Sequence, residues 1–279
     1  MSGACSKSVH KKAELAPSFL ISQRMGVEDL ANEQKLLLAR TEDLYTLCDK
    51  YCCPRFSTFL DEAQQQDIME NIGQRSGYSS GFFGGYPAAQ RKIFGVFPEW
   101  FTYSEADFLI KVLKFTKNYG ETLTHRDYLG TILSLGIDRA KTGDILVDGD
   151  TAYVFVAEDI AEFIRDQVTK VANRGVKIEI ITCGEAVIPE QKFEEIKAVA
   201  ASLRLDAVIA AILNLSRNTA GKLVEAGRVS VNHRAAAETA KGLAEGDVLS
   251  VKGYGRFILS QVGGKTRSER LHVIIKKYI

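Results

Sequence analysis

A short segment near the C-terminus carries the residue types best suited to binding an anion. The spacing predicts a helix that Ser216 caps with its hydroxyl and that Gly227 ends in a left-handed conformation. Arg217, Asn218 and Lys222 gather on the polar side of this helix. Unpaired backbone N–H groups and the helix dipole add to the charge of an arginine at a helix start. The segment therefore predicts phosphate as its ligand.

Basic residues are concentrated in the same part of the chain. Residues 204–279 contain 13 Lys or Arg and 6 Asp or Glu, a net charge of +7. The whole chain has a formal net charge of +1, so residues 1–203 carry −6. A basic region of this kind is typical of a nucleic-acid module, because neutralising phosphates releases condensed counterions. Charge alone leaves a solvated basic face as the alternative.

A second chemistry-bearing motif, His125-Arg126-Asp127, imitates the catalytic loop of protein kinases. The sequence lacks the Gly-rich loop, the strand lysine and the Asp-Phe-Gly motif that kinase catalysis requires, so we exclude this activity. Asp127 is expected to serve the first turn of a helix instead. His125 and Arg126 are candidate RNA contacts in the middle of the chain, with a structural or solvated role as the alternative.

The five cysteines form an odd set: Cys5, Cys48, Cys52, Cys53 and Cys183. An odd number excludes a complete disulfide framework and favours a reducing cytoplasm. Three of them lie close together, but zinc sites usually use paired C-x-x-C spacings and no second cluster follows. We expect plain thiols, no metal site and no cofactor.

Aromatic side chains occur in a Gly-rich stretch, residues 77–87, that is predicted to form a loop. Beside Arg91 and Lys92, such a loop suits single-stranded RNA stacked on aromatic faces. A loop with Phe82 and Phe83 buried is the alternative, and we favour it. Four further aromatic residues border a strand of alternating apolar character and are expected in the core: Phe94, Phe97, Trp100 and Phe101.

The elements that position these residues begin with a helical N-terminal part. Apolar residues recur at helical spacings over residues 27–74, with a break at Pro54. Thr58 or Asp61 is expected to cap a second helix that runs to about Gly73. We therefore predict a helical lead-in over residues 1–90.

The middle of the chain changes to a period of two. Short β-rich runs predict strands at residues 92–97, 107–115, 144–147, 151–156 and 177–182. Helices are predicted at residues 124–135, with Thr124 as the N-cap, and at residues 158–172. This order indicates a small α+β sheet domain over residues 91–183, with its helices on one face. Residues 184–203, rich in Glu, Lys and Ala, are predicted to form a helical linker.

The C-terminal part, residues 204–279, is predicted to hold two helices and short antiparallel strands. The first helix is indicated by apolar residues at i, i+3, i+4, i+7 and i+8: Leu205, Val208, Ile209, Ile212 and Leu213. Strands are predicted at residues 228–231, 248–251 and 257–259, separated by turn signals. The predicted fold class of the whole chain is therefore α+β.

Composition sets the wider limits. Hydrophobic residues at 46% and charged residues at 25% match an ordinary globular protein. The longest apolar runs fall far short of the roughly 18–20 residues that span a bilayer. The N-terminus lacks the apolar stretch of a signal peptide. We expect a soluble cytoplasmic protein without a membrane partner.

Four motifs in the C-terminal part are familiar: Arg204-Leu-Asp206, Ser216-Arg217-Asn-Thr-Ala220, Val224-x-x-Gly227-x-Val229-x-Val231-Asn232 and Gly246-Asp247-Val248. Over about residues 204–259 the chain resembles the αL-type RNA-binding domain named after small-subunit ribosomal protein four. The resemblance implies that the two helices and the following loop form an RNA face. Its predicted contact residues are Arg204, Ser216, Arg217, Asn218, Lys222, Arg228, Asn232, His233, Arg234, Lys252 and Arg256. Asp206 is expected to orient Arg204 or cap its helix rather than touch phosphate.

Further stretches extend the resemblance: Gly84-Gly-Tyr-Pro87, residues 123–137, Gly143-Asp-Ile-Leu-Val147 and Ala157-Glu-Asp-Ile160. They are similar to the bacterial YlmH family, over most of residues 25–279. The resemblance implies association with tRNA and with large ribosomal subunits that hold a peptidyl-tRNA, in ribosome-associated quality control. A link to cell division is weaker. Residues 1–24 lie outside the resemblance.

Enzymes that carry the αL-type module leave other signatures. The catalytic domain of a pseudouridine synthase would follow the module, yet only about 20 residues follow Leu259. The signatures of tyrosyl-tRNA synthetases, a G-x-G-x-x-G motif and a P-loop are also missing from the sequence. We predict a noncatalytic RNA-binding factor with structured rRNA or tRNA as its partner and no DNA. The alternative is a cell-division-linked protein-interaction adaptor with weak or no RNA affinity.

Overall fold

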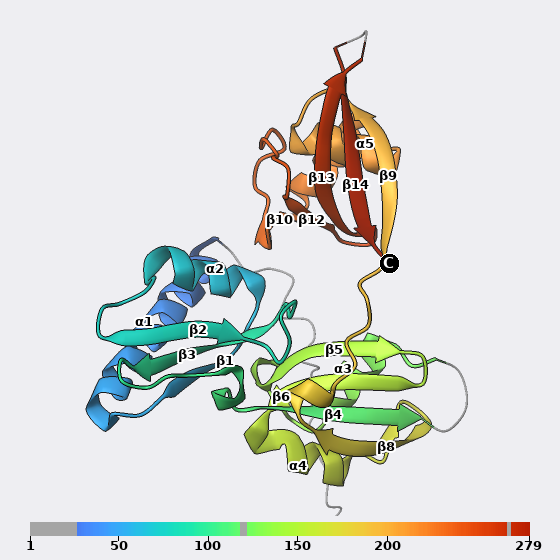
Figure 1. Cartoon of the computed structure of the whole chain (residues 1–279). Coiled ribbons are helices and arrows are strands. Elements are labelled where there is room, and N and C mark those ends of the chain that lie inside the picture. Colours follow the sequence, from blue (N-terminus) through green and yellow to red (C-terminus); the bar gives the residue numbers. More distant parts are fainter. Residues whose placement is uncertain (1–26, 118–121, 267–268) are drawn as a thin grey trace, which may run out of the picture.

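The computed structural model describes residues 27–117, 122–266 and 269–279. Three antiparallel sheets follow one another along the chain, and helices pack against each of them (Figure 1). This arrangement confirms the predicted α+β fold class. None of the helices in the described ranges is long and apolar enough to cross a membrane.

The N-terminal sheet departs most from the predicted fold. Its elements are α1 (Val27–Tyr51), β1 (Arg55–Leu60), α2 (Glu62–Asn71), β2 (Tyr78–Phe83) and β3 (Lys92–Pro98), with strand order β1-β3-β2. A helical lead-in over residues 1–90 is therefore wrong for β1 and β2, and β3 belongs to this sheet instead of the middle one. Asp61 caps α2 as predicted, because its carboxylate accepts the N–H of Gln64 at 2.9 Å.

The Gly-rich stretch forms strand β2 because its glycines make room for an aromatic ring. Gly81 lies opposite Gly95 in the β2–β3 pair. A Cβ atom on Gly81 would lie 2.6 Å from the hydroxyl of Tyr103. The Tyr103 ring lies across the sheet and stacks on Phe97, with 4.2 Å between the ring centroids. Glycine here serves close packing, so the loop predicted over residues 77–87 is wrong for residues 78–83, while residues 84–87 lie outside the strands.

Two of the four aromatic residues expected in the core are fully inside it. Phe94 and Phe97 are 3% and 0% exposed, and Phe101 is half-buried. Trp100 is 71% exposed, so its predicted burial is wrong. The reason is local, since β3 ends at Pro98 and the chain turns there, with the N–H of Phe101 donating to the Pro98 carbonyl at 2.9 Å.

The middle sheet has the strand order β5-β6-β4-β8-β7. Its elements are β4 (Ile110–Lys117), α3 (His125–Ser134), β5 (Thr142–Asp148), β6 (Thr151–Ala157), α4 (Glu158–Gln167), β7 (Lys170–Val171) and β8 (Arg174–Ile181). Both helices pack on one face, as predicted, because Ile132 of α3 and Ile164 of α4 share a core with Leu113 of the sheet. The second helix ends earlier than predicted, since Ala172 takes a left-handed φ of 49° in the turn between β7 and β8.

The other face of the middle sheet packs against the N-terminal sheet. Phe155 and Val112 share a buried cluster with Phe59, Phe83 and Phe97. A carboxylate joins the same two parts: Asp144 accepts the hydroxyl of Tyr86 and the N–H of Gln90, at 2.8 and 2.7 Å. Residues from both parts thus form one continuous core.

The C-terminal sheet has the strand order β11-β10-β12-β13-β14-β9. Its elements are β9 (Phe193–Ala200), α5 (Leu205–Leu213), α6 (Arg217–Glu225), β10 (Val229–Val231), β11 (Arg234–Ala235), β12 (Val248–Val251), β13 (Gly255–Lys265) and β14 (Leu271–Tyr278). The predicted helical linker over residues 184–203 is wrong, because β9 pairs along its whole length with β14. Residues 193–200 of the predicted linker form the edge strand of the C-terminal sheet.

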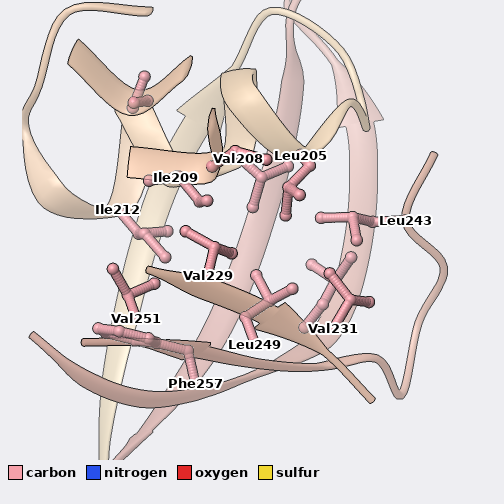
Figure 2. Close-up of a cluster of buried hydrophobic side chains, with 14 of the residues drawn as sticks. Leu205, Val208, Ile209, Ile212, Val229, Val231, Leu243, Leu249, Val251 and Phe257 are labelled. Atoms are coloured by element: carbon pink, nitrogen blue, oxygen red, sulfur yellow. The ribbon is translucent and has the colours of Figure 1, made fainter. Parts of the chain in front are cut away.

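A buried apolar cluster holds α5 against the C-terminal sheet. Figure 2 shows Val208 and Ile209 of α5 pointing toward Leu249 and Val251 of β12. All four side chains are almost fully buried. Because α5 leads directly into α6, this core also fixes where α6 begins.

Candidate RNA interface

The start of α6 has the geometry that the sequence predicts. The hydroxyl of Ser216 accepts the N–H of Thr219 at 3.1 Å, so Ser216 is the N-cap. Gly227 follows the helix with a φ of +64°. Arg217 occupies the first helical position, where the positive end of the helix dipole adds to its charge. The helix start predicted for the anion site is therefore present, and its ligand stays a prediction.

A buried carboxylate holds two arginines at this site. Asp206 is 7% exposed and accepts Nε and Nη2 of Arg204 at 3.2 Å each. It also accepts Nη2 of Arg217 at 2.8 Å. Burial favours the protonated acid, but hydrogen bonds from both guanidinium groups hold the pKa of Asp206 below its ordinary value. The prediction that Asp206 orients Arg204 is confirmed, and the structure adds Arg217.

The polar side of α6 continues this surface. Asn218 and Lys222 are exposed, and neither side chain has a hydrogen-bond partner among the described residues. Gly221 lies between them without a side chain. Two fixed guanidinium groups and a free ammonium group thus share one face of the C-terminal domain.

Asn232 belongs to a turn. Its side chain donates to Asp247 at 2.8 Å and accepts the N–H of Val248 at 2.9 Å. Asn232 and His233 both have positive φ, at 48° and 66°, as a two-residue hairpin between β10 and β11 requires. The amide of Asn232 therefore shapes the loop with one N–H and one lone pair, and the RNA contact predicted for it stays a prediction.

Three more predicted contacts face an acidic helix instead of open solvent. Arg234 pairs with Asp67 at 2.6 Å and with Glu70 at 3.0 Å. Glu62 accepts Nη2 of Arg256 at 2.5 Å and lies 2.8 Å from Nδ1 of His233. Burial works against the charge of Glu62, but the hydrogen bonds from His233 and Arg256 lower its pKa. Helix α2 therefore docks on the basic C-terminal domain through its carboxylates.

The candidates in the middle of the chain divide into two groups. Arg91 donates to the carbonyls of Phe59 and Thr142 at 2.9 and 3.0 Å, so it joins the first two sheets. Burial lowers the pKa of Arg91, and Lys92 is half-buried beside it. Arg126, in contrast, is exposed at the start of α3. It lines a cleft of about 810 Å³ together with Arg228, His233, Lys252 and Arg256 of the C-terminal domain.

The residue before Arg126, His125, has a shifted pKa. Partial desolvation and the guanidinium of Arg139 hold the pKa of His125 below its ordinary value. Arg139 donates to the carbonyls of Thr142 and Gly143, and burial lowers its own pKa to about 10. Sequence patterns did not single out Arg139, because its role depends on contacts with the folded sheet. The lowered pKa favours the neutral imidazole of His125, and its predicted RNA contact stays a prediction.

Metal-binding and thiol chemistry find little support in the described ranges. No group of three or more His, Cys, Asp or Glu side chains there is arranged to hold a metal ion. Cys48, Cys52, Cys53 and Cys183 are free thiols, as predicted. Cys5 lies outside the described residues.

Comparisons with known proteins match the middle and the C-terminal parts of the chain separately. A model described as an RNA-binding domain in YlmH matches residues 104–185, and an S4 domain model matches residues 203–249. The chain is 32% identical over 226 residues to ribosome-associated protein quality control protein P2 of Bacillus subtilis strain 168, covering 80% of this chain and 87% of the relative. A solved structure, cell division protein ylmH from Streptococcus pneumoniae, has 22% identity and a TM-score of 0.48, covering 60% of this chain and 99% of that one.

Proposed function

Because the chain belongs to the YlmH family of RNA-binding proteins, we propose that it binds structured RNA on the ribosome and carries out no catalysis. Two RNA-binding domain matches and the name of the Bacillus subtilis relative support the ribosomal part of this proposal. The cytoplasm is the compartment that it implies, and it stays a prediction.

The arginine pair at the start of α6 carries the proposal. Guanidinium groups present several N–H donors in a plane, which matches the oxygens of a phosphate. Asp206 holds Arg204 and Arg217 side by side while their side chains stay 46% and 52% exposed. The orientation is therefore fixed before RNA arrives, which lowers the entropy cost of binding.

In this proposal, binding through the start of α6 positions the protein on RNA and involves no chemical reaction. Phosphate contacts fix the register of a protein on RNA but carry no base information. The exposed face of α6 offers charged and amide groups, which suits recognition of RNA shape. We propose that rRNA or tRNA on a large subunit carrying peptidyl-tRNA is the RNA bound.

A direct binding measurement tests the α6 face. We expect Lys222→Glu to weaken binding of a fluorescein-labelled tRNA transcript several-fold and to flatten the salt dependence by about one unit or more. Arg217→Gln should act in the same direction without placing a new carboxylate beside Asp206. Lys276→Glu is the matched control, because Lys276 is exposed and neighbours the core residue Ile275 along β14, so it lies on the opposite face of the sheet.

Two results would contradict the proposal. The first is equal tRNA and rRNA affinity in wild type, Lys222→Glu and Arg217→Gln. The second is no affinity in any form at low salt, which would support the protein-interaction adaptor instead.

A further inference from the structure

The cleft between the middle and C-terminal domains gathers cationic side chains from two different parts of the chain. Arg126 enters it from the start of α3, and Arg228 and Lys252 enter it from the C-terminal sheet. Its volume of about 810 Å³ lies within the range of roughly 300–1,000 Å³ typical of ligand sites. No carboxylate is among the residues that line it.

Three of the cationic side chains that line this cleft, Arg126, Arg228 and Lys252, have no carboxylate partner within the part of the chain that the structure describes. The side chains of Arg126 and Lys252 have no carboxylate or hydrogen-bond partner there, while His233 and Arg256 share Glu62. Arg228 donates one Nη2 bond to the carbonyl of Lys252 at 2.8 Å, which holds it at the rim. Three cations thus converge without an acid, which is unfavourable unless an anion joins them.

The floor of the cleft leaves room for a chain of atoms. Gly253 lies in the turn between β12 and β13 and Gly255 begins β13, both with positive φ, at 94° and 113°. Neither glycine has a side chain that would fill the cleft, and Ser230 and Ser250 add only small hydroxyl groups. Phe, Tyr and Trp are missing from the residues that line the cleft, and its one imidazole, that of His233, lies beside Glu62, so the cleft offers charge and little stacking surface.

Both walls are attached to one body. Arg126 is on α3, and the sheet against which α3 packs shares an apolar core with the N-terminal sheet, through Phe155 and Phe59. Helix α2 of that N-terminal part contacts the C-terminal domain, where Glu62 forms an ion pair with Arg256 and Asp67 forms one with Arg234. Glu62 neutralises His233 and Arg256 within the cleft, Asp67 neutralises Arg234 beside it, and Arg126, Arg228 and Lys252 remain without a carboxylate among the described residues.

We propose that this cleft binds the phosphodiester backbone of an RNA strand, so that the protein grips RNA with two domains at once. The inference rests on the proposed function, since it assumes that the chain binds RNA. The cleft residues are different from those of the α6 face. Backbone contacts without stacking predict binding that is independent of base sequence.

Removing the positive charge of Arg126, on the α3 side of the cleft, tests this proposal. Arg126→Gln should weaken binding of the labelled tRNA transcript several-fold and lower the slope of log affinity against log salt by about one unit. Arg126→Gln with Lys252→Gln should lower the slope by about two. Arg165→Gln is the control, because Arg165 is exposed on α4 and does not line the cleft.

Two further measurements distinguish an RNA strand in the cleft from other anions. Bound tRNA should protect the amine of Lys252 from acetylation and leave Lys276 reactive. Excess ATP, which has phosphates but no phosphodiester chain, should leave the tRNA affinity unchanged. Displacement of tRNA by ATP would overturn the proposal and make the cleft a nucleotide site.

Failure of the inference is distinguishable from failure of the proposed function. Wild-type affinity and salt slope in Arg126→Gln, together with loss of binding in Lys222→Glu, would reject the cleft and leave the α6 face standing. Wild-type affinity in every one of these variants would reject both.

Discussion

The two basic surfaces differ in how their charges are held. At α6 a single buried carboxylate, Asp206, fixes Arg204 and Arg217 within one domain. In the cleft, Arg126 and Lys252 come from two domains, and contacts of α2 with the C-terminal sheet bring them together. The first surface depends only on local folding, whereas the second depends on how domains dock. Substitutions can therefore disturb either surface separately.

The largest effect is expected from the core beneath α5. Ile209→Ala removes a fully buried side chain and should lower the free energy of unfolding by about 2–5 kcal/mol. The α6 face should be lost with it, because α5 positions the start of α6. Chemical denaturation and tRNA binding measure both effects. Val199→Ala is the control, since Val199 is 41% exposed on β9, and an equal cost for both variants would contradict the assigned core.

A smaller effect is expected from the carboxylate that orients the arginines. Asp206→Asn removes the charge from two charge-assisted contacts and should cost about 1–3 kcal/mol of stability. The pKa of Asp206 is lower in the folded chain, so its stabilisation is present above the ordinary carboxyl range and is lost as the pH falls through the folded value. Denaturation at pH 7 and in acid should therefore show a steeper pH dependence in wild type than in Asp206→Asn. Parallel pH curves for the two proteins would argue against this role.

The third effect concerns docking instead of stability. Neutralising the α2 carboxylates, with Glu62→Gln, Asp67→Asn and Glu70→Gln together, should release the C-terminal domain and raise the radius of gyration measured by X-ray scattering. Exposed ion pairs are weak singly, so the three changes are combined. Raised salt should have the same effect on wild type, because it screens these pairs.

The control for docking neutralises three acids on α4, namely Glu158, Asp159 and Glu162. It changes the net charge equally without touching the C-terminal domain. An unchanged radius of gyration in the α2 variant, or an equal rise in the control, would show that these pairs do not hold the domains together.

Local signals in the sequence were sufficient for the α6 face. The cap at Ser216, the stop at Gly227 and the apolar spacing of α5 all act within a few residues, so the pattern predicts them correctly. The edge strand β9 was missed because it is specified by β14, which lies more than seventy residues later. An isolated edge strand rich in Glu and Lys has the composition of a helix until its partner is known.

Ion pairs between residues far apart in the chain also could not be predicted from the sequence. Arg234 lies 167 residues from Asp67, and Arg256 lies 194 residues from Glu62. Sequence patterns predict each of these side chains as solvated or RNA-facing, because nothing local records a partner at that distance. Only the folded chain separates the cations that α2 neutralises from those that stay free in the cleft.

The most direct test of RNA binding on the ribosome is cosedimentation with purified large ribosomal subunits, with and without peptidyl-tRNA and across a salt series. We expect binding that strengthens when peptidyl-tRNA is present, falls steeply as salt rises and is weakened in Lys222→Glu but not in Lys276→Glu. Absence of binding at every salt concentration, with free tRNA also unbound, would contradict it.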